Sequence, residues 1–192
     1  MLTIQRCTLE TMETIYKTKM PDDFPAAEIK PFSKIKRMYQ DGAYFAYGLY
    51  DASELVGYAF FCISPEKDAV LLDYLAISAE HRNKGYGAEF LKKLCLVLSD
   101  FRYILLEVDD VAHAKTDAEL KIRKRRIGFY QRCGAQLTTV RNIIFGCPFQ
   151  VLYFPLSEAA DNNTVLSVLK QIYTIMLTPE QFMQNADFFI AP

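Results

Sequence analysis

Ten residues near the middle of the chain read Ala79-Glu80-His81-Arg82-Asn83-Lys84-Gly85-Tyr86-Gly87-Ala88 and separate a predicted strand from a predicted helix. Two glycines at the mouth of a helix leave its first backbone N–H groups unshielded, at the positive end of the helix dipole. Arg82 and Lys84 add cationic donors to the same stretch. We therefore predict an anion-binding site in this loop, against the simpler interpretation of an ordinary glycine turn.

The segments on either side of the loop form a strand–helix–strand unit. Residues 69–78 (AVLLDYLAIS) have the composition of a strand, and residues 85–99 carry apolar side chains at helical spacing. Residues 103–108 (YILLEV) then read as a short buried strand. The anion-binding loop thus joins the first strand of a βαβ unit to its helix.

The flanking sequence completes an α+β pattern in a single domain. Upstream, we expect a strand and two helices, followed by two strands that form a hairpin around residues 51–54; downstream, we expect a helix ending at Gly134, a second hairpin and a helical tail. The tail ends in Phe188-Phe189-Ile190, an apolar patch that we expect to need a partner. The prediction is a seven-stranded sheet flanked by helices.

Two common nucleotide-binding motifs do not fit the loop. A dinucleotide fingerprint requires a third glycine, and Phe90 stands at that position. The phosphate-binding motif G-x-x-x-x-G-K-[ST] does not occur in the chain, which argues against an ATP or GTP hydrolase.

The loop does resemble the pyrophosphate-binding motif of the GNAT acyltransferase superfamily, [QR]-x-x-G-x-[GA], in the residues Arg82-Asn83-Lys84-Gly85-Tyr86-Gly87. A second segment, Arg126-Ile127-Gly128-Phe129-Tyr130-Gln131-Arg132-Cys133-Gly134-Ala135, is similar to the Tyr-x-x-x-Gly ending of a helix in that family. The resemblance spans about Leu2 to Phe154. It implies a mixed, mainly antiparallel sheet, a catalytic acyl-CoA-binding domain over residues 1–156, and a C-terminal helical extension over residues 157–192 that packs on the domain or at a subunit interface.

The resemblance also implies where acetyl-CoA, as co-substrate, would bind. Its pantetheine arm would pair with the backbone of Leu75, Ala76 and Ile77, and Arg82 and Lys84 would pair with the charge of its pyrophosphate. The pyrophosphate would accept hydrogen bonds from the N–H groups of Asn83, Lys84, Gly85, Tyr86, Gly87 and Ala88.

The implied chemistry is direct transfer of an acetyl group to an amine, which needs a proton acceptor for the ammonium and a donor for the thiolate. Tyr130 stands where the family often carries the tyrosine that protonates the thiolate, although a helical tyrosine is also a common core residue. Asp73 is the candidate base, because it lies two residues before Leu75 on the same face of its strand. Glu107 is the rival, and either acid could instead be paired with an arginine in a purely structural role.

One helix departs from the family pattern. Arg123 stands seven residues before Tyr130, where the family often has Asn, and it belongs to a group of five cations: Lys121, Arg123, Lys124, Arg125 and Arg126. This group is either a solvated helix face or a means of neutralising CoA phosphates or an acidic substrate, with Arg126 as the candidate for cofactor binding.

Composition limits the remaining functions. The chain of 192 residues has 22 Lys and Arg against 23 Asp and Glu, too balanced for general nucleic-acid binding. The spacing of its five cysteines and two histidines supports neither a zinc site nor a disulfide framework. No signal peptide or membrane span is evident, so we expect a cytoplasmic protein.

The function predicted from the sequence is therefore an acetyl-CoA-dependent N-acetyltransferase that uses no metal. Its acceptor would be a small-molecule amine or a peptide, and the tail could pair two subunits into a homodimer. The alternative is a non-catalytic acyl-CoA-binding or regulatory module on the same fold.

Overall fold

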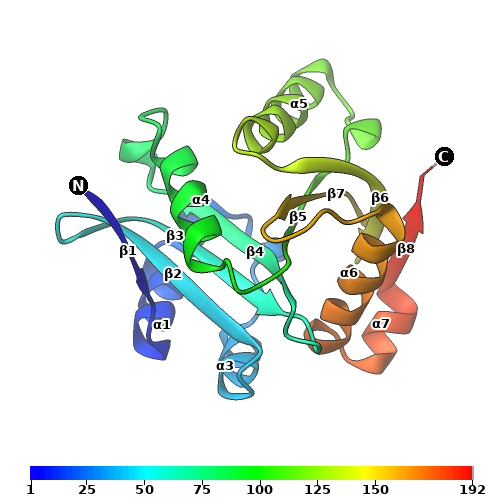
Figure 1. The fold of residues 1–192 in the computed structure, drawn as a ribbon, viewed down its shortest axis with the longest axis horizontal. Helices are drawn as coiled ribbons and strands as arrows, with labels where there is room; N and C mark the ends of the chain where they lie inside the picture. Colours follow the sequence, from blue (N-terminus) through cyan, green and yellow to red (C-terminus); the bar gives the residue numbers. More distant parts are fainter. Residues whose placement is uncertain (192) are drawn as a thin grey trace. The chain divides into compact units, whose positions relative to one another are not determined.

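A computed structural model describes residues 1–191, which form two compact units (Figure 1). The first unit comprises residues 1–62 and 72–96, and the second comprises residues 63–71 and the chain from residue 97 onward. Strand β4 (Ala69–Ile77) begins in the second unit and continues into the first.

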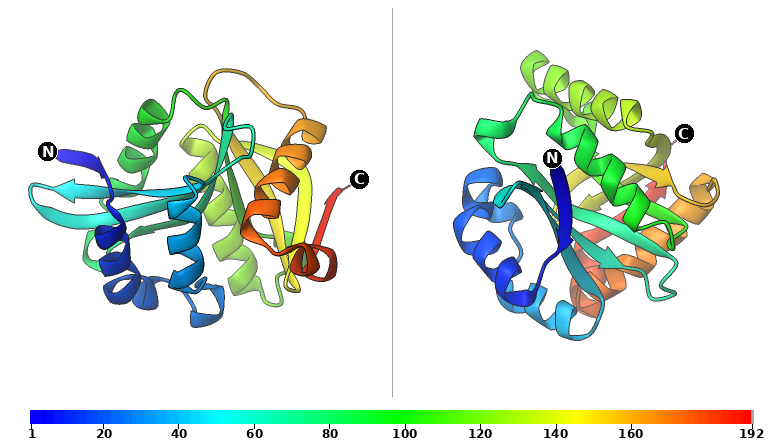
Figure 2. Two further views of the ribbon diagram at one scale, coloured as in Figure 1. Left: turned by 90° about the horizontal axis from the view of Figure 1, so that it is seen from below. Right: turned by 60° about the vertical axis from the view of Figure 1, so that its left-hand side comes forward.

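In the first unit the strands follow the order β1-β2-β3-β4, and β1·β2 and β2·β3 are antiparallel. Figure 2 shows helices α1 and α3 on one face of these strands and α4 on the other. Its remaining elements, besides β4, are β1 (Leu2–Arg6), α1 (Leu9–Thr18), α2 (Met20–Asp23), the 3-10 turn η1 (Ala26–Glu28), α3 (Phe32–Gln40), β2 (Tyr44–Asp51), β3 (Glu54–Ile63), the 3-10 turn η2 (Ala79–His81) and α4 (Tyr86–Val97).

In the second unit the strands follow the order β5-β7-β6-β8, and all three neighbouring pairs are antiparallel. Helix α6 packs against β6 and β8, whereas α5 packs against β5 and β6. The elements are β5 (Tyr103–Asp109), the 3-10 turn η3 (Val111–His113), α5 (Asp117–Arg132), β6 (Gln136–Ile144), β7 (Cys147–Pro155), α6 (Asn162–Met176), α7 (Pro179–Asn185) and β8 (Ala186–Ile190).

Local sequence signals account for the ends of several helices. The side chains of Thr8, Thr116 and Asp161 accept hydrogen bonds at the starts of α1, α5 and α6. Thr178 forms a capping box with Gln181 at the start of α7. Each side chain satisfies a backbone donor that the helix itself leaves unpaired, so the starts of these four helices are well defined.

The α+β class and the mainly antiparallel sheet are confirmed, but the predicted number of seven strands is wrong. Residues 1–191 form eight strands, because Ala186–Ile190 forms β8 instead of continuing a helical tail. β8 pairs with β6 from Val140↔Ile190 to Ile144↔Ala186. Phe188 stacks on Phe182 with ring centroids 5.6 Å apart and so finds a partner within the chain, whereas Phe189 and Ile190 stay exposed.

None of the helices formed by the described residues combines the length and the apolar character that crossing a bilayer requires.

Gly57 on β3 is required by close packing against β4. A Cβ atom added there would lie 2.6 Å from Ile77 Cδ1 and 2.9 Å from the Ala76 carbonyl oxygen. We expect Gly57→Ala to lower the free energy of unfolding by about 1–3 kcal/mol, because a backbone oxygen cannot move aside cheaply. Urea denaturation measures the change.

The matched control for this prediction is Gly128→Ala in α5. There a Cβ would meet only the flexible end of Arg132, at 3.2 Å, and alanine favours a helix interior by roughly 0.5–1 kcal/mol over glycine. Equal stability of Gly57→Ala and the unsubstituted chain would contradict the packing argument.

Candidate functional site

The loop before α4 presents a row of free backbone donors. Asn83 and Gly85 adopt positive φ angles of 63° and 82°, which turn the chain into the helix. The backbone bond that enters the helix runs from Glu89 N–H to the Gly85 carbonyl at 3.1 Å. Within the described part of the chain, the N–H groups of residues 83–88 donate to no protein acceptor. These N–H groups and the helix dipole suit an anion, as the glycine pattern predicts.

Arg82 is held in place beside these donors. Its Nε donates to the Ile77 carbonyl at 2.9 Å, and its Nη2 lies 2.6 Å from Asp23 Oδ1. The Asp23 carboxylate, 8% exposed, also accepts a hydrogen bond from the Tyr58 hydroxyl at 2.9 Å. Since a guanidinium carries five N–H donors, Arg82 keeps further donors for a ligand. Lys84 is exposed on the same loop.

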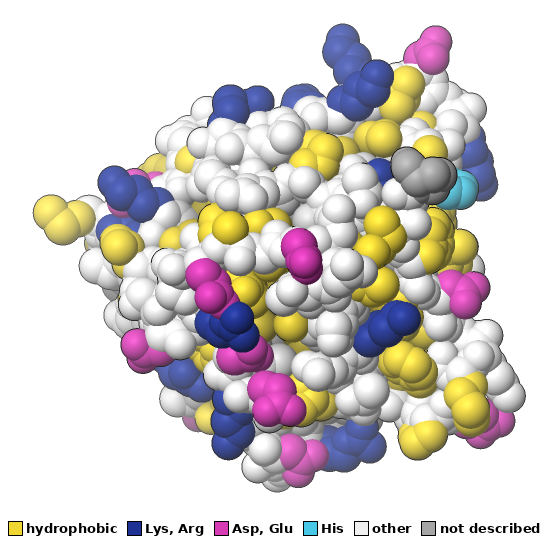
Figure 3. Space-filling view, turned by 45° about the vertical axis from the view of Figure 1, so that its right-hand side comes forward, with side chains coloured by type: hydrophobic (Ala, Val, Ile, Leu, Met, Phe, Trp, Pro, Cys, Tyr) yellow, Lys and Arg dark blue, Asp and Glu magenta, His cyan; other side chains and the backbone are white. Residues whose placement is uncertain are grey.

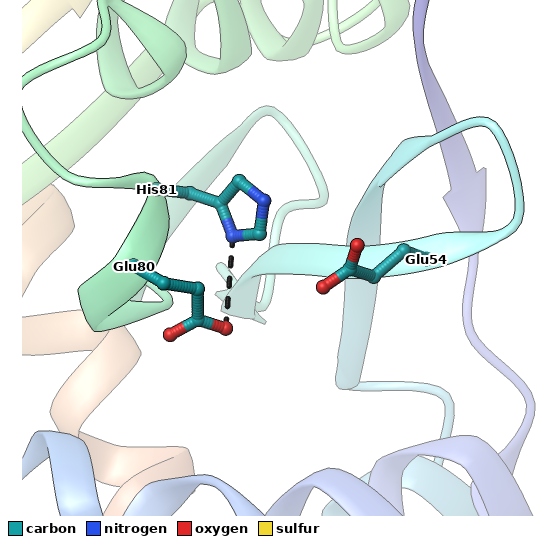
Figure 4. Close-up of side chains that lie close together, drawn as sticks. All are labelled: Glu54, Glu80 and His81. Atoms are coloured by element: carbon teal, nitrogen blue, oxygen red, sulfur yellow. Dashed lines mark ion pairs between the residues drawn. The ribbon is translucent and has the colours of Figure 1, made fainter.

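The flank of the loop is formed by His81, whose ring stacks on Tyr86 with centroids 5.6 Å apart. The Tyr86 hydroxyl donates to Asp51 at 2.8 Å, which fixes the first residue of α4. Figure 4 shows Glu54, Glu80 and His81 together, with His81 Nδ1 3.6 Å from Glu80 Oε1. Their potential ligand atoms lie within 4.8 Å of one another, but both glutamates are exposed, as acidic surface groups commonly are, and we assign no metal to them.

The part of β4 that leads into the loop has one half-open face. Asp73, Leu75 and Ile77 are partly exposed as residues and alternate with buried Tyr74 and Ala76, although the Asp73 side chain itself is only 7% exposed. Asp73 thus shares a face with Leu75 and Ile77, as the strand period predicts.

Asp73 is paired, and its partner is a lysine. Lys30 Nζ lies 2.7 Å from Asp73 Oδ1, and the Tyr44 hydroxyl donates to the other carboxylate oxygen. Lys30 is fixed in turn by Tyr74, whose hydroxyl accepts its backbone N–H at 2.9 Å and whose ring centroid lies 5.0 Å from its Nζ. Burial and the neighbouring Asp73 raise the pKa of Tyr44 well above its ordinary value, so Tyr44 remains a donor to this carboxylate.

The rival acid, Glu107, belongs to a separate network in the second unit. Its carboxylate accepts the Tyr173 hydroxyl of α6 at 2.8 Å and the side-chain amide of Asn142 on β6. Asn142 is fully buried, and its amide oxygen has no hydrogen-bond partner among the described residues. Glu107 therefore joins helix α6 to the sheet.

Tyr130 lies in the last turns of α5, in the second unit, and is partly exposed. Burial raises the pKa of its hydroxyl to about 12. No hydrogen bond engages this hydroxyl within the described chain, and its ring contacts Phe129 at a centroid distance of 5.3 Å. The Tyr130 hydroxyl is thus a phenol with a raised pKa that no hydrogen bond from the described residues occupies.

The cationic side chains of α5 divide into two groups. Lys121, Lys124 and Arg125 are exposed, as a solvated helix face predicts. Arg123 donates to the Asp110 carbonyl, and Arg126 Nη1 lies 2.9 Å from Asp109 Oδ2, so both are tied to the end of β5. Arg126 is half exposed and retains donors for an anion.

The structure brings Asp73, Leu75, Ala76, Ile77 and residues 82–88 together in the first unit, whereas Tyr130, Arg126 and Glu107 lie in the second. The sequence did not predict the three side chains that hold Arg82 and Asp73 in place. Asp23 pairs with Arg82, and Lys30 and Tyr44 bind the carboxylate of Asp73. Lys30 is 43 residues from Asp73 in the chain, so no local motif marks the pair. The apolar surroundings of Asp73 were the one signal that a partner should exist.

A family comparison agrees with these motifs. The model of the GNAT acetyltransferase family matches residues 9–135, a range that contains both the loop before α4 and the end of α5. The chain belongs to the GNAT family. A search of the curated proteins finds no match to the chain.

Solved structures show the same fold as this GNAT chain. A putative GNAT acetyltransferase from Bacteroides thetaiotaomicron is 21% identical with a TM-score of 0.69, over 90% of this chain and 95% of that one. Mutant forms of a spermidine/spermine N-acetyltransferase from Vibrio cholerae are 15% identical with a TM-score of 0.57, over 82% and 96%. A GNAT acetyltransferase from Elizabethkingia anophelis with acetyl-CoA bound is 15% identical with a TM-score of 0.57, over 81% and 98%. Membership of the GNAT family identifies this chain as an acetyltransferase.

Proposed function

We propose that this GNAT protein transfers an acetyl group from acetyl-CoA directly to an amine. The row of free N–H donors on residues 83–88, beside the fixed guanidinium of Arg82, carries the proposal. It offers a pyrophosphate several hydrogen bonds, a helix dipole and a positive charge at one place. The pantetheine arm would pair with Leu75, Ala76 and Ile77, and the acetyl-CoA bound to the Elizabethkingia anophelis protein supports the choice of cofactor.

In this proposal two side chains move protons. Asp73 accepts the proton that the acceptor's ammonium must lose before its nitrogen can attack the thioester carbonyl. As the C–N bond forms and the C–S bond breaks, Tyr130 donates a proton to the departing thiolate. A pKa of about 12 keeps Tyr130 protonated at neutral pH, which suits an acid. Arg126 contributes positive charge toward the CoA phosphates.

Release of free CoA, measured with a thiol reagent across a panel of primary amines, tests the proposed transfer. We expect release that depends on the amine and an acetylated product of matching amount. Binding of acetyl-CoA in calorimetry without release from any amine would instead support a non-catalytic acyl-CoA-binding module.

A further inference from the structure

Next to Asp73 the first unit carries a concentration of positive charge. Residues 30–40 read KPFSKIKRMYQ and contain no acidic side chain. Their cations are Lys30, Lys34, Lys36 and Arg37. Lys30 is neutralised by Asp73 at 2.7 Å, so the positive charge of α3 itself has no counterpart within the segment.

Lys34 differs from the other cations of α3, because it is only partly exposed whereas Lys36 and Arg37 are exposed. Within the described residues its ammonium makes no ion pair or hydrogen bond. Burial and the charges of Lys30 and Arg37 lower the pKa of Lys34, while Asp73 and Cys62 act in the opposite direction. Lys34 also lies only four residues after Lys30, whose ammonium is paired with Asp73 at 2.7 Å. Since no anionic partner engages Lys34 among the described residues, its ammonium gains from an anion that a ligand supplies.

The position of Asp73 along β4 connects this cation to the proposed reaction. Asp73 lies four residues before Ile77, which corresponds to about 13 Å of strand. A ligand whose phosphates bind residues 83–88 and whose arm follows Ile77, Ala76 and Leu75 therefore extends toward Asp73. The acceptor amine would meet the thioester at this end of the strand.

We infer that the acceptor is an amine that also carries an anionic group, a carboxylate or a phosphate, with its ammonium at Asp73 and its anion at Lys34. This inference rests on the proposed acetyl transfer. This pairing gives the half-buried ammonium of Lys34 an anionic partner and holds the acceptor by both of its charged groups. A polyamine, by contrast, would bring further positive charge toward Lys30, Lys34 and Arg37, and like charges brought together at a binding surface disfavour association.

Pairs of amines that differ in the anionic group test the inference. Phenylalanine is compared with phenylalaninamide, and phosphoethanolamine with ethanolamine, while spermidine serves as the polycationic probe. We expect the anionic member of at least one pair to give a kcat/KM at least about 10-fold above its neutral partner, and which pair responds distinguishes carboxylate from phosphate. Equal kcat/KM values within both pairs, a preference for the neutral members, or a preference for spermidine would overturn the inference while leaving the acetyl transfer intact.

Substitution of two lysines on α3 tests whether Lys34 itself binds the anionic group. Lys34→Met should raise KM for the anionic acceptor about 10- to 100-fold and leave acetyl-CoA affinity unchanged, whereas Lys36→Met, which removes the same charge from an exposed position, should change neither. Equal effects of the two variants would refute a specific role of Lys34. Calorimetry of the same probes in the presence of CoA measures the preference without turnover. Anion-dependent binding with no CoA release would therefore reject the transfer reaction and retain the anion site.

Discussion

The Gly85→Asp variant is expected to bind acetyl-CoA at least about 100-fold more weakly than the unsubstituted protein. Gly85 is exposed, and an added Cβ would meet no atom within 4 Å, so a side chain there enters open space at the loop where we place the pyrophosphate. A carboxylate about 4 Å from one phosphate charge costs roughly 4 kcal/mol at an effective dielectric constant of 20. Calorimetric titration with acetyl-CoA measures the loss.

Gly146→Asp is the control for this substitution. Gly146 also has a positive φ, 79°, and open space around an added Cβ, but it lies in the turn between β6 and β7. Both variants should therefore lose similar stability from backbone strain, and only Gly85→Asp should lose affinity. Undiminished acetyl-CoA binding by Gly85→Asp would remove the loop before α4 as the phosphate site.

Tyr130→Phe is expected to lower kcat by about 10²- to 10⁴-fold, the usual contribution of a general acid, with little change in acetyl-CoA affinity. Because the Tyr130 hydroxyl has no hydrogen-bond partner in the described chain, the free energy of unfolding should change little. With a pKa of about 12, Tyr130 stays more than about nine-tenths protonated up to roughly pH 11, so its ionisation should cause no alkaline loss of turnover below that pH.

Tyr153→Phe is the control for Tyr130→Phe, because it should lower stability and leave turnover unchanged. The Tyr153 hydroxyl donates to Gln136 at 2.7 Å and accepts the Ala160 N–H at 3.1 Å, so its removal should destabilise the fold by about 1–2 kcal/mol and leave kcat unchanged. Stopped-flow or steady-state CoA release together with urea denaturation separates the two roles. Full turnover by Tyr130→Phe would exclude Tyr130 as the acid.

The sequence predicts this fold well wherever the signal is local. Glycines at the start of α4, the capping Thr178 and the alternation along β4 each fix the backbone through neighbours a few residues away. The common face of Asp73, Leu75 and Ile77 follows from the strand period alone. The predicted position of the anion loop follows from the glycines that precede the helix.

The contacts between distant segments are what the sequence could not reveal. Asp23 and Arg82 are 59 residues apart in the chain. Nothing in the composition of residues 21–31 distinguishes an acid that pairs with an arginine from an acid that faces solvent. β8 was missed for a related reason, since its five residues are too few for a period-2 pattern to stand out after a helix. Its pairing with β6 depends on a strand more than 40 residues earlier.

The pairing of β8 with β6 also bears on self-association. A strand at the edge of a sheet exposes backbone donors and acceptors to which a neighbouring chain can add. Because β8 pairs with Val140 to Ile144 of β6, that part of the template is occupied, and the new edge is only five residues long. The C-terminal segment thus acts as a built-in guard against edge-to-edge aggregation, a role independent of any acetyl transfer.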